Sequence, residues 1–249
     1  MMKNISTALM VCAAMAASIT VTEAASEDDR KKIEIQLLKQ THPLTNQQKN
    51  TALIAAYAAT GEMGGLQSSL EQGLDAGLTV SDCREVLVQL YAYAGFPRSL
   101  NALVELMKVV ESRKQRGKKD VQGSQPGPMP SPEEMLAAGT RNQTALVGQP
   151  VKGPLFEFAP AIDQYLKTHL FGDIFVRDNL NWKTRELATV GALSAMSGVE
   201  SQLKSHLTVS MNVGLSTEQL AELVPFFLSH HLDKAAEQLQ SALKVLTQD

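Results

Sequence analysis

The sequence predicts an all-α fold in which two pseudo-symmetric, antiparallel helical repeats pack as one domain. Three observations support this prediction: a composition that favours helices, apolar residues at helical spacing, and an internal repeat at an offset of 137 positions. Apolar residues make up 44% of the 249 residues and aromatic residues only 5%, while Ala, Leu and Gln are common. Unbranched side chains of this kind keep their rotamer freedom in a helix.

Residues 1–25 have the features of a cleaved secretory signal peptide. Lys3 gives a positive start, an apolar stretch follows, and Ala24 and Ala25 offer a small-residue cleavage site. A membrane-spanning helix is the alternative, but the apolar core is short and is broken by Ser and Thr. We therefore expect a periplasmic or secreted protein without a membrane segment after cleavage.

The first repeat covers residues 26–112 and opens with a short helix. The stretch 26–40 is charged and then periodic, which favours a helix. Pro43 breaks this pattern, and Thr45 is placed to cap the helix that comes next.

Three further helical runs are expected in this repeat. Residues 50–60 are nearly all apolar, which predicts a helix that is buried on all sides. The amphipathic run 66–76 ends at Gly77, and a third helix follows a capping residue in 79–81. Pro97 interrupts that third helix before the helical spacing resumes, because proline cannot continue the hydrogen-bond ladder.

Residues 113–135 form the predicted linker, which is basic at first and then rich in Gly, Pro, Ser and Gln. The second repeat covers residues 136–249. It contains a predicted helix that ends near Gly172 and the stretch 182–214, where Gly198 separates two helices that fold back on each other.

The repeat itself is visible as identities without a gap. They pair Ala55 with Ala192, Ala58 with Ala195, Gly61 with Gly198, Leu66 with Leu203, Ser68 with Ser205, Leu70 with Leu207, Gly77 with Gly214 and Glu85 with Glu222. Such copies normally bury their apolar faces against each other. The copies differ where chemistry is expected, since Glu186 aligns with Lys49 and His206 with Ser69. We infer that the second copy supplies proton-transfer groups and the first supplies part of a pocket wall.

Glu186 and His206 are the candidate catalytic residues. A buried carboxyl near the start of an apolar helix would suit a general acid or base, whereas the alternative is an exposed Glu that interacts with the helix dipole. His206 is a proton donor or acceptor, or else a packed and satisfied histidine. Gln202 lies one turn before His206 and is a candidate for orienting a substrate carbonyl.

The remaining candidates are substrate-binding residues. Arg185 and Arg98 are candidates for holding a carboxylate, although a structural salt bridge is the alternative for each. Tyr93, Phe96 and Trp182 are expected in the pocket wall or the core.

Charge, cysteine and histidine content exclude several classes of function. The net charge of −3 gives no basic surface for nucleic acid. Cys12 lies in the segment that we expect to be removed, so Cys83 has no disulfide or redox partner and is expected to be buried. We expect no metal and no cofactor, because His230 and His231 point in different directions on a helix and no ligand set has zinc spacing.

Four sequence motifs resemble those of the carboxymuconolactone decarboxylase family, in its two-repeat form, over about residues 45–246. They are GLTVSDCREVLVQLYAYAGFPRSLNAL in the first half and FGDIFVRDNL, RELATVGALSA and QLKSHLTVSMNVGLS in the second. The resemblance implies the alkylhydroperoxidase D-like all-α fold and association as homotrimers or homohexamers. It also implies a lyase that acts on a small carboxylated lactone or a related unsaturated acid by Glu/His proton transfer.

The alkylhydroperoxidase D-like branch of this family reduces peroxides with a Cys-x-x-Cys-x-x-x-His motif and an upstream Glu. Glu186 and His206 match the Glu and His, but Val199 and Gln202 occupy the two cysteine positions. A thiol peroxidase is therefore disfavoured, because the thiolate is the nucleophile. The remaining alternative to the lyase is an exported, non-catalytic binding or assembly protein with the same fold.

Overall fold

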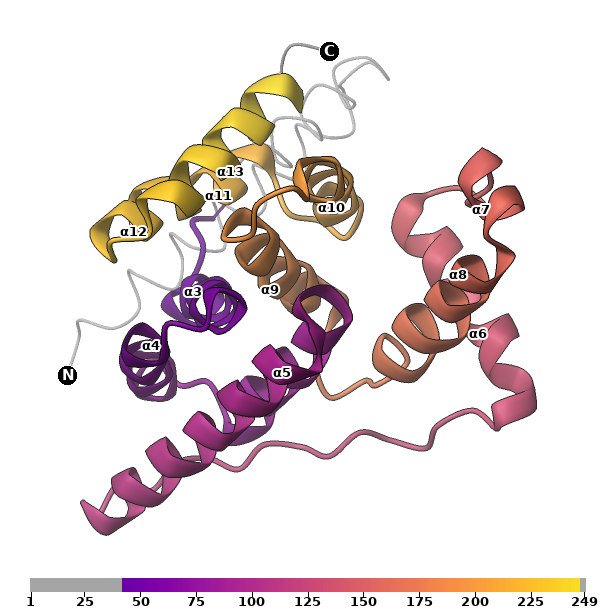
Figure 1. Ribbon diagram of the computed structural model, residues 1–249. Helices are drawn as coiled ribbons and strands as arrows, with labels where there is room; N and C mark the ends of the chain where they lie inside the picture. Colours follow the sequence, from indigo (N-terminus) through magenta and orange to yellow (C-terminus); the bar gives the residue numbers. More distant parts are fainter. Residues whose placement is uncertain (1–41, 247–249) are drawn as a thin grey trace, which may run out of the picture. The chain divides into compact units, whose positions relative to one another are not determined.

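The computed structural model describes residues 42–246, which contain helices and no strand (Figure 1). The helices are α3 (Asn46–Thr60), α4 (Met63–Asp75), α5 (Val80–Gln115), α6 (Pro132–Val147), α7 (Pro154–Phe158), α8 (Pro160–Tyr165), the π-helix η1 (Leu166–Ile174), α9 (Trp182–Ser194), α10 (Glu200–Asn212), α11 (Thr217–Ala221), α12 (Leu223–Ser229) and α13 (Asp233–Leu246). The all-α prediction is confirmed for these residues. Every one of these helices is too short or too polar to cross a membrane. The predicted signal peptide and the helix at 26–40 lie outside the described residues.

Helix α3 is the centre of the core, between α4, α5 and α9 (Figure 1). It begins with a capping box, in which the Thr45 hydroxyl accepts from the Gln48 N–H at 3.2 Å and the Gln48 side chain accepts from the Thr45 N–H at 2.9 Å. Every residue in 50–59 is buried, as the apolar run predicted. Small side chains allow α3 and α9 to approach so closely that a β-carbon on Gly191 would overlap the backbone of Ala52.

Helix α5 is a hairpin of two helical arms, 80–94 and 96–115. Gly95 has φ 81° and ψ 160°, which lies outside the helical region and needs a residue without a β-carbon. The Ser99 hydroxyl donates to the carbonyl oxygen of Leu87 at 2.7 Å, although a straight helix would separate these residues by about 18 Å. The interruption predicted from Pro97 is therefore a reversal of direction.

The helix bounds follow the 137-residue offset. Helix α4 starts at Met63 and α10 at Glu200, and the turn glycines that precede them, Gly61 and Gly198, have φ 79° and φ 78°. His231, one position before the counterpart of Gly95 at this offset, also has a positive φ, of 57°. The backbone conformation thus recurs along with the sequence, and the symmetry relation between the two copies stays a prediction.

The segment that joins α5 to α6 is mostly exposed and runs back along the first arm of α5. Val80 N–H donates to the Val121 carbonyl and Ser81 N–H to the Gln122 carbonyl, each at 2.9 Å. Its start is fixed by Arg113, which is only 2% exposed and bonds Asp120 at 2.7 Å. The first part of this segment, up to Gly127, is therefore held in place by polar contacts.

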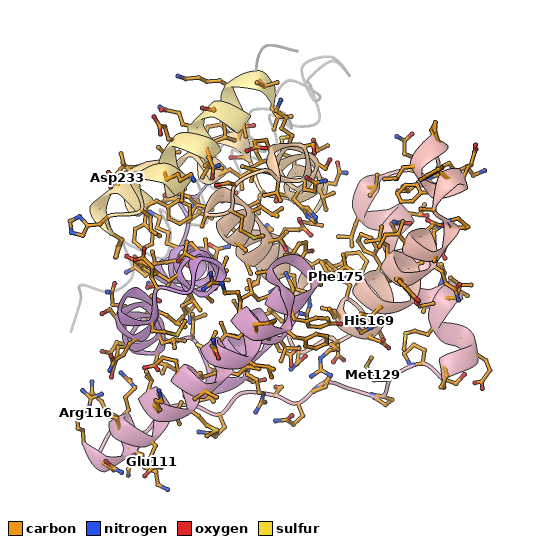
Figure 2. The ribbon with its side chains drawn as sticks, viewed as in Figure 1. Glu111, Arg116, Met129, His169, Phe175 and Asp233 are labelled. Atoms are coloured by element: carbon orange, nitrogen blue, oxygen red, sulfur yellow. The ribbon has the colours of Figure 1, made fainter. Side chains whose placement is uncertain are left out.

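Helix α6 and η1 form a smaller hydrophobic cluster that also includes residues of α5 and α10. Its buried members are Leu146, Leu170, Phe171, Ile174, Phe175 and Val209. Figure 2 shows His169 and Phe175 on the side of η1 nearest α5, and the His169 ring lies 5.3 Å from the ring of Tyr91. The predicted helix ending near Gly172 corresponds to α8 and η1, which together run from Pro160 to Ile174.

Candidate functional site

The start of α9 positions two charged residues that are wholly buried. The Asn181 side chain caps the helix by accepting from the Thr184 N–H at 2.9 Å. Arg185 and Glu186 follow, and both are 0% exposed. Because consecutive helical residues point in different directions, Arg185 reaches α5 while Glu186 reaches α10.

Glu186 and His206 form a hydrogen-bonded pair, called here the Glu186–His206 dyad. The Glu186 Oε2 atom lies 2.8 Å from the His206 Nδ1 atom, and the two side chains are 0% and 14% exposed. A carboxylate at Nδ1 favours the tautomer that carries its proton there. The Nε2 atom, which has no partner among the described residues, is then free to exchange a proton with a bound molecule.

Tyr93 completes the group around the dyad. Its ring meets the His206 ring edge-on, with 5.5 Å between the centroids. Burial raises the pKa of the Tyr93 hydroxyl well above its usual range, and the charge of Glu186 raises it further. Within residues 42–246, neither the Tyr93 hydroxyl nor Glu186 Oε1 has a hydrogen-bond partner, although Thr189 lies near enough to the hydroxyl to lower its pKa.

Arg185 belongs to a buried ionic network centred on Glu85. Glu85 is 1% exposed and receives Arg177 Nη2 at 2.6 Å, Arg177 Nε at 2.8 Å and Arg185 Nη2 at 3.2 Å. Burial alone would raise the pKa of Glu85, but the hydrogen bonds of Arg177 and the charges of both arginines lower it to about 2. The Gln89 side chain also bonds Arg185 Nη1, at 3.2 Å. The Arg185 guanidinium is thus largely engaged within the protein.

The other candidates from the sequence lie apart from this network. Gln202 is exposed and accepts a hydrogen bond from Ser201. Arg98 packs at the α3–α4 turn, with Nη1 1.5 Å from the point that a β-carbon on Gly61 would occupy. Phe96 is 61% exposed and stacks on Tyr91 at 4.5 Å between centroids. The structure therefore brings Tyr93 to the dyad but gives Arg98, Phe96 and Gln202 other contacts.

Cys83 is fully buried, and burial raises its pKa to about 12. A thiol in this setting is not available as a thiolate near neutral pH. No group of three His, Cys, Asp or Glu side chains in the described part of the chain is arranged as metal ligands.

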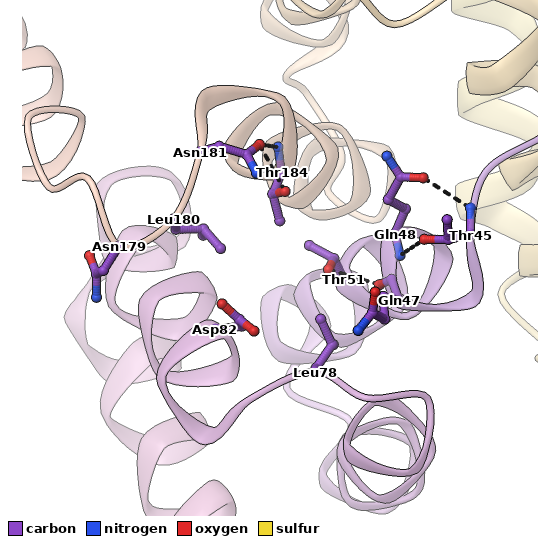
Figure 3. Close-up of a pocket in the computed structure, with 10 residues that line it drawn as sticks. All are labelled: Thr45, Gln47, Gln48, Thr51, Leu78, Asp82, Asn179, Leu180, Asn181 and Thr184. Carbon is purple, nitrogen blue, oxygen red and sulfur yellow. Dashed lines mark hydrogen bonds between the residues drawn. The ribbon is translucent and has the colours of Figure 1, made fainter. Parts of the chain in front are cut away.

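Two cavities lie near the start of α9. The first, of about 380 Å³, lies between the starts of α3 and α9, and Figure 3 shows that Thr45, Gln48, Asn181 and Thr184 use polar groups there in capping bonds. The second, of about 460 Å³, is lined by Trp182 and by parts of α6 and the segment between η1 and α9. Neither of these two cavities is lined by the members of the dyad.

Several residues of the site were not found by reasoning on the sequence. Glu85, Gln89, Arg177 and Thr189 hold the start of α9, and although they lie within the family motifs quoted above, none of them was singled out as a site residue. The one available signal was the recurrence of Glu85 at Glu222, which itself pairs with Lys49 at 2.7 Å.

The described residues form an all-helical fold in which Glu186 of α9 and His206 of α10 form a carboxylate–imidazole pair. Such a pair is typical of proteins that transfer protons by general acid–base chemistry. Residues 160–245, which run from α8 to α13 and contain the dyad, match the model of the carboxymuconolactone decarboxylase family. This match supports membership of residues 160–245 in the carboxymuconolactone decarboxylase family. A comparison with curated proteins gave no match to the chain.

Proposed function

We propose that this protein is a lyase that acts on a small carboxylated lactone or a related unsaturated acid through proton transfer by Glu186 and His206. The observation that supports the proposal is the dyad itself: a carboxylate with no exposure, bonded at 2.8 Å to an imidazole that is 14% exposed. Buried carboxylates that orient a histidine are typical of general acid–base sites. The family of the matched domain is consistent with such chemistry.

In the proposed reaction, the carbon–carbon bond to the carboxylate breaks and its electron pair stays on the substrate as an enolate, while carbon dioxide leaves. Glu186 stabilises the imidazolium of His206, which donates its Nε2 proton to the carbon and becomes neutral, and a solvent proton then restores the imidazolium. General acid catalysis of this kind contributes about 10²–10⁴-fold in rate.

Tyr93 is proposed as the donor to the enolate oxygen. Its hydroxyl is buried without a full hydrogen bond in the described residues, so a substrate oxygen would satisfy a group that otherwise costs folding free energy. The raised pKa keeps the phenol protonated at neutral pH, as a donor requires. This role differs from the pocket-wall role expected from the sequence.

We also propose that the chain self-associates as a homotrimer or homohexamer and is exported by its leader. Phe96, Leu100, Val104 and Met107 form one face of the second arm of α5 and are 48–71% exposed, which is unusual for apolar side chains on a monomer. Sedimentation equilibrium tests the association: a monomer at micromolar concentration contradicts it. The N-terminal sequence of the protein recovered from its cells tests cleavage after residue 25.

The test of the proposed reaction is carbon dioxide release from candidate lactone acids by wild type, Glu186→Gln and His206→Ala. We expect the His206→Ala variant to lose about 10²-fold or more in kcat, and Glu186→Gln to lose activity as well. The matched control is Ser205→Ala, an exposed neighbour on α10 whose hydroxyl donates to the Ser201 carbonyl. Unchanged turnover in both dyad variants rejects the proton-transfer roles.

A non-catalytic binding or assembly protein is the second candidate, and the observation that favours it is that neither cavity described above is lined by the dyad. Binding of a lactone acid without carbon dioxide release would support this candidate. A thiol peroxidase is a third candidate that the buried Cys83 and the residues Val199 and Gln202 oppose.

A further inference from the structure

The cavity beside Trp182 has the size and lining of a small-molecule site. Its volume is about 460 Å³, within the range of about 300–1,000 Å³ of ligand sites in proteins. It is bounded by α6, by the segment from Phe175 to Trp182 and by Pro130 at the end of the linker. Because three separate parts of the chain close around it, the cavity exists only in the folded protein.

Positive charge is available at this cavity. Arg141 lines it, is exposed and has no partner among residues 42–246. Arg177 also lines it and uses Nε and Nη2 to bond Glu85, which leaves Nη1 without a partner in the described part of the chain. Asp178 is the one carboxylate in the lining, and its Oδ1 accepts from the Gly127 N–H at 2.8 Å.

Apart from Asn142 and Asn181, the remaining lining is apolar and includes an aromatic surface. Phe175 and Leu180 are 2% and 5% exposed. The Trp182 indole N–H already donates to the Phe175 carbonyl at 3.0 Å, so the indole has no donor left and can offer a ligand only its ring. The Arg177 side chain is held by a buried carboxylate of depressed pKa, so it is in place before any ligand arrives.

We propose that this cavity binds a small aromatic carboxylate, with the carboxylate on Arg141 and Arg177 and the ring against Trp182. Guanidinium groups recognise carboxylates with paired hydrogen bonds, and the apolar floor favours an organic anion over a hydrated inorganic one. The site shares no residue with the Glu186–His206 dyad, so it stands whether or not the proposed reaction occurs.

Tryptophan fluorescence reports directly on ligand binding at this cavity, because Trp182 lines it and is the only tryptophan in the sequence. Benzoate is titrated into the full chain with selective tryptophan excitation, and benzamide serves as the uncharged probe of the same shape. We expect a saturable change in emission with benzoate and binding at least about tenfold weaker with benzamide. Arg141→Gln should weaken benzoate by about tenfold or more, while the exposed control Lys114→Gln leaves it unchanged.

Equal benzoate binding by wild type and Arg141→Gln overturns the proposal, as does equal binding of benzoate and benzamide. A response to inorganic phosphate as strong as that to benzoate also overturns it, because the ring would then contribute nothing. Loss of the benzoate response in His206→Ala but not in Arg141→Gln would place the ligand at the dyad and reject this site. Circular dichroism of Arg141→Gln, whose side chain is exposed, verifies that the variant is folded.

Discussion

The carbonyl oxygen of Ala52 lies 2.2 Å from the point that a β-carbon on Gly191 would occupy. Helices α3 and α9 therefore touch through their backbones, at a crossing that joins the two halves of the chain. Both partners have to be small for this contact to form, and the side chains around them pack at the density of a protein interior.

Replacing Gly191 with alanine should destabilise the protein. The new methyl group would meet backbone atoms, which cannot turn away as a flexible side chain can, so we expect a loss of about 1–3 kcal/mol in the free energy of unfolding. Gly64→Ala is the matched control, because nothing lies within 4 Å of its added carbon and alanine is the better helix former by about 1 kcal/mol. Urea denaturation checks both variants, and similar midpoints for the two would refute the backbone contact.

Removing the Tyr93 hydroxyl should leave the fold as stable or make it more stable. Its buried oxygen lacks a full partner, and such a group costs about 1–3 kcal/mol. Tyr57→Phe is the comparison, since the Tyr57 hydroxyl donates to the His230 carbonyl and its loss should cost about 1 kcal/mol. Thermal unfolding measures both. If Tyr93→Phe proves the more damaging of the two, the hydroxyl has a structural partner and its assignment as a substrate donor fails.

The Glu85 carboxylate should make stability depend on pH in the acid range. Its pKa is about 2 in the folded protein and near 4.5 ordinarily, so the carboxylate stabilises the fold above pH 4.5 and this contribution disappears as the pH falls towards 2. The difference amounts to on the order of 3 kcal/mol.

Glu85→Gln tests this contribution by urea denaturation at several pH values between 7 and 2.5. At pH 7 the variant should lose about 3–5 kcal/mol, because two arginines lose their buried partner. The loss relative to wild type should shrink as the pH falls, while exposed Glu111→Gln should follow wild type throughout. A constant difference between Glu85→Gln and wild type would show that its charge does not control acid stability.

Much of the fold could be predicted from local sequence. The apolar run at 50–60 and the cap at Thr45 are local features, and they correspond to a buried α3 with a capping box. The break near Pro97 is also local, but the sequence did not indicate that the helix would reverse there, which depends on the φ of 81° at Gly95 and on the contact between Ser99 and Leu87.

The site could be predicted in part, and the missing part consists of long-range pairs. Glu186 and His206 stand in motifs and do meet at 2.8 Å. The partner of Arg185 could not be found in the same way, because Glu85 lies 100 positions away and any of several carboxylates would have matched. The contact between the Val80 N–H and the Val121 carbonyl uses backbone atoms, so the types of side chain in the sequence do not predict it.

The burial of α3 affects how the chain folds while it is being synthesised. During synthesis, α4 and α5 follow α3 directly, but the face of α3 that packs on α9 waits for roughly 140 further residues, and at about 5–20 residues per second this delay is on the order of 10 s. The nascent first half is thus an incomplete folding unit, with an exposed alanine-rich face that chaperones or a translocation channel could hold until its partner arrives.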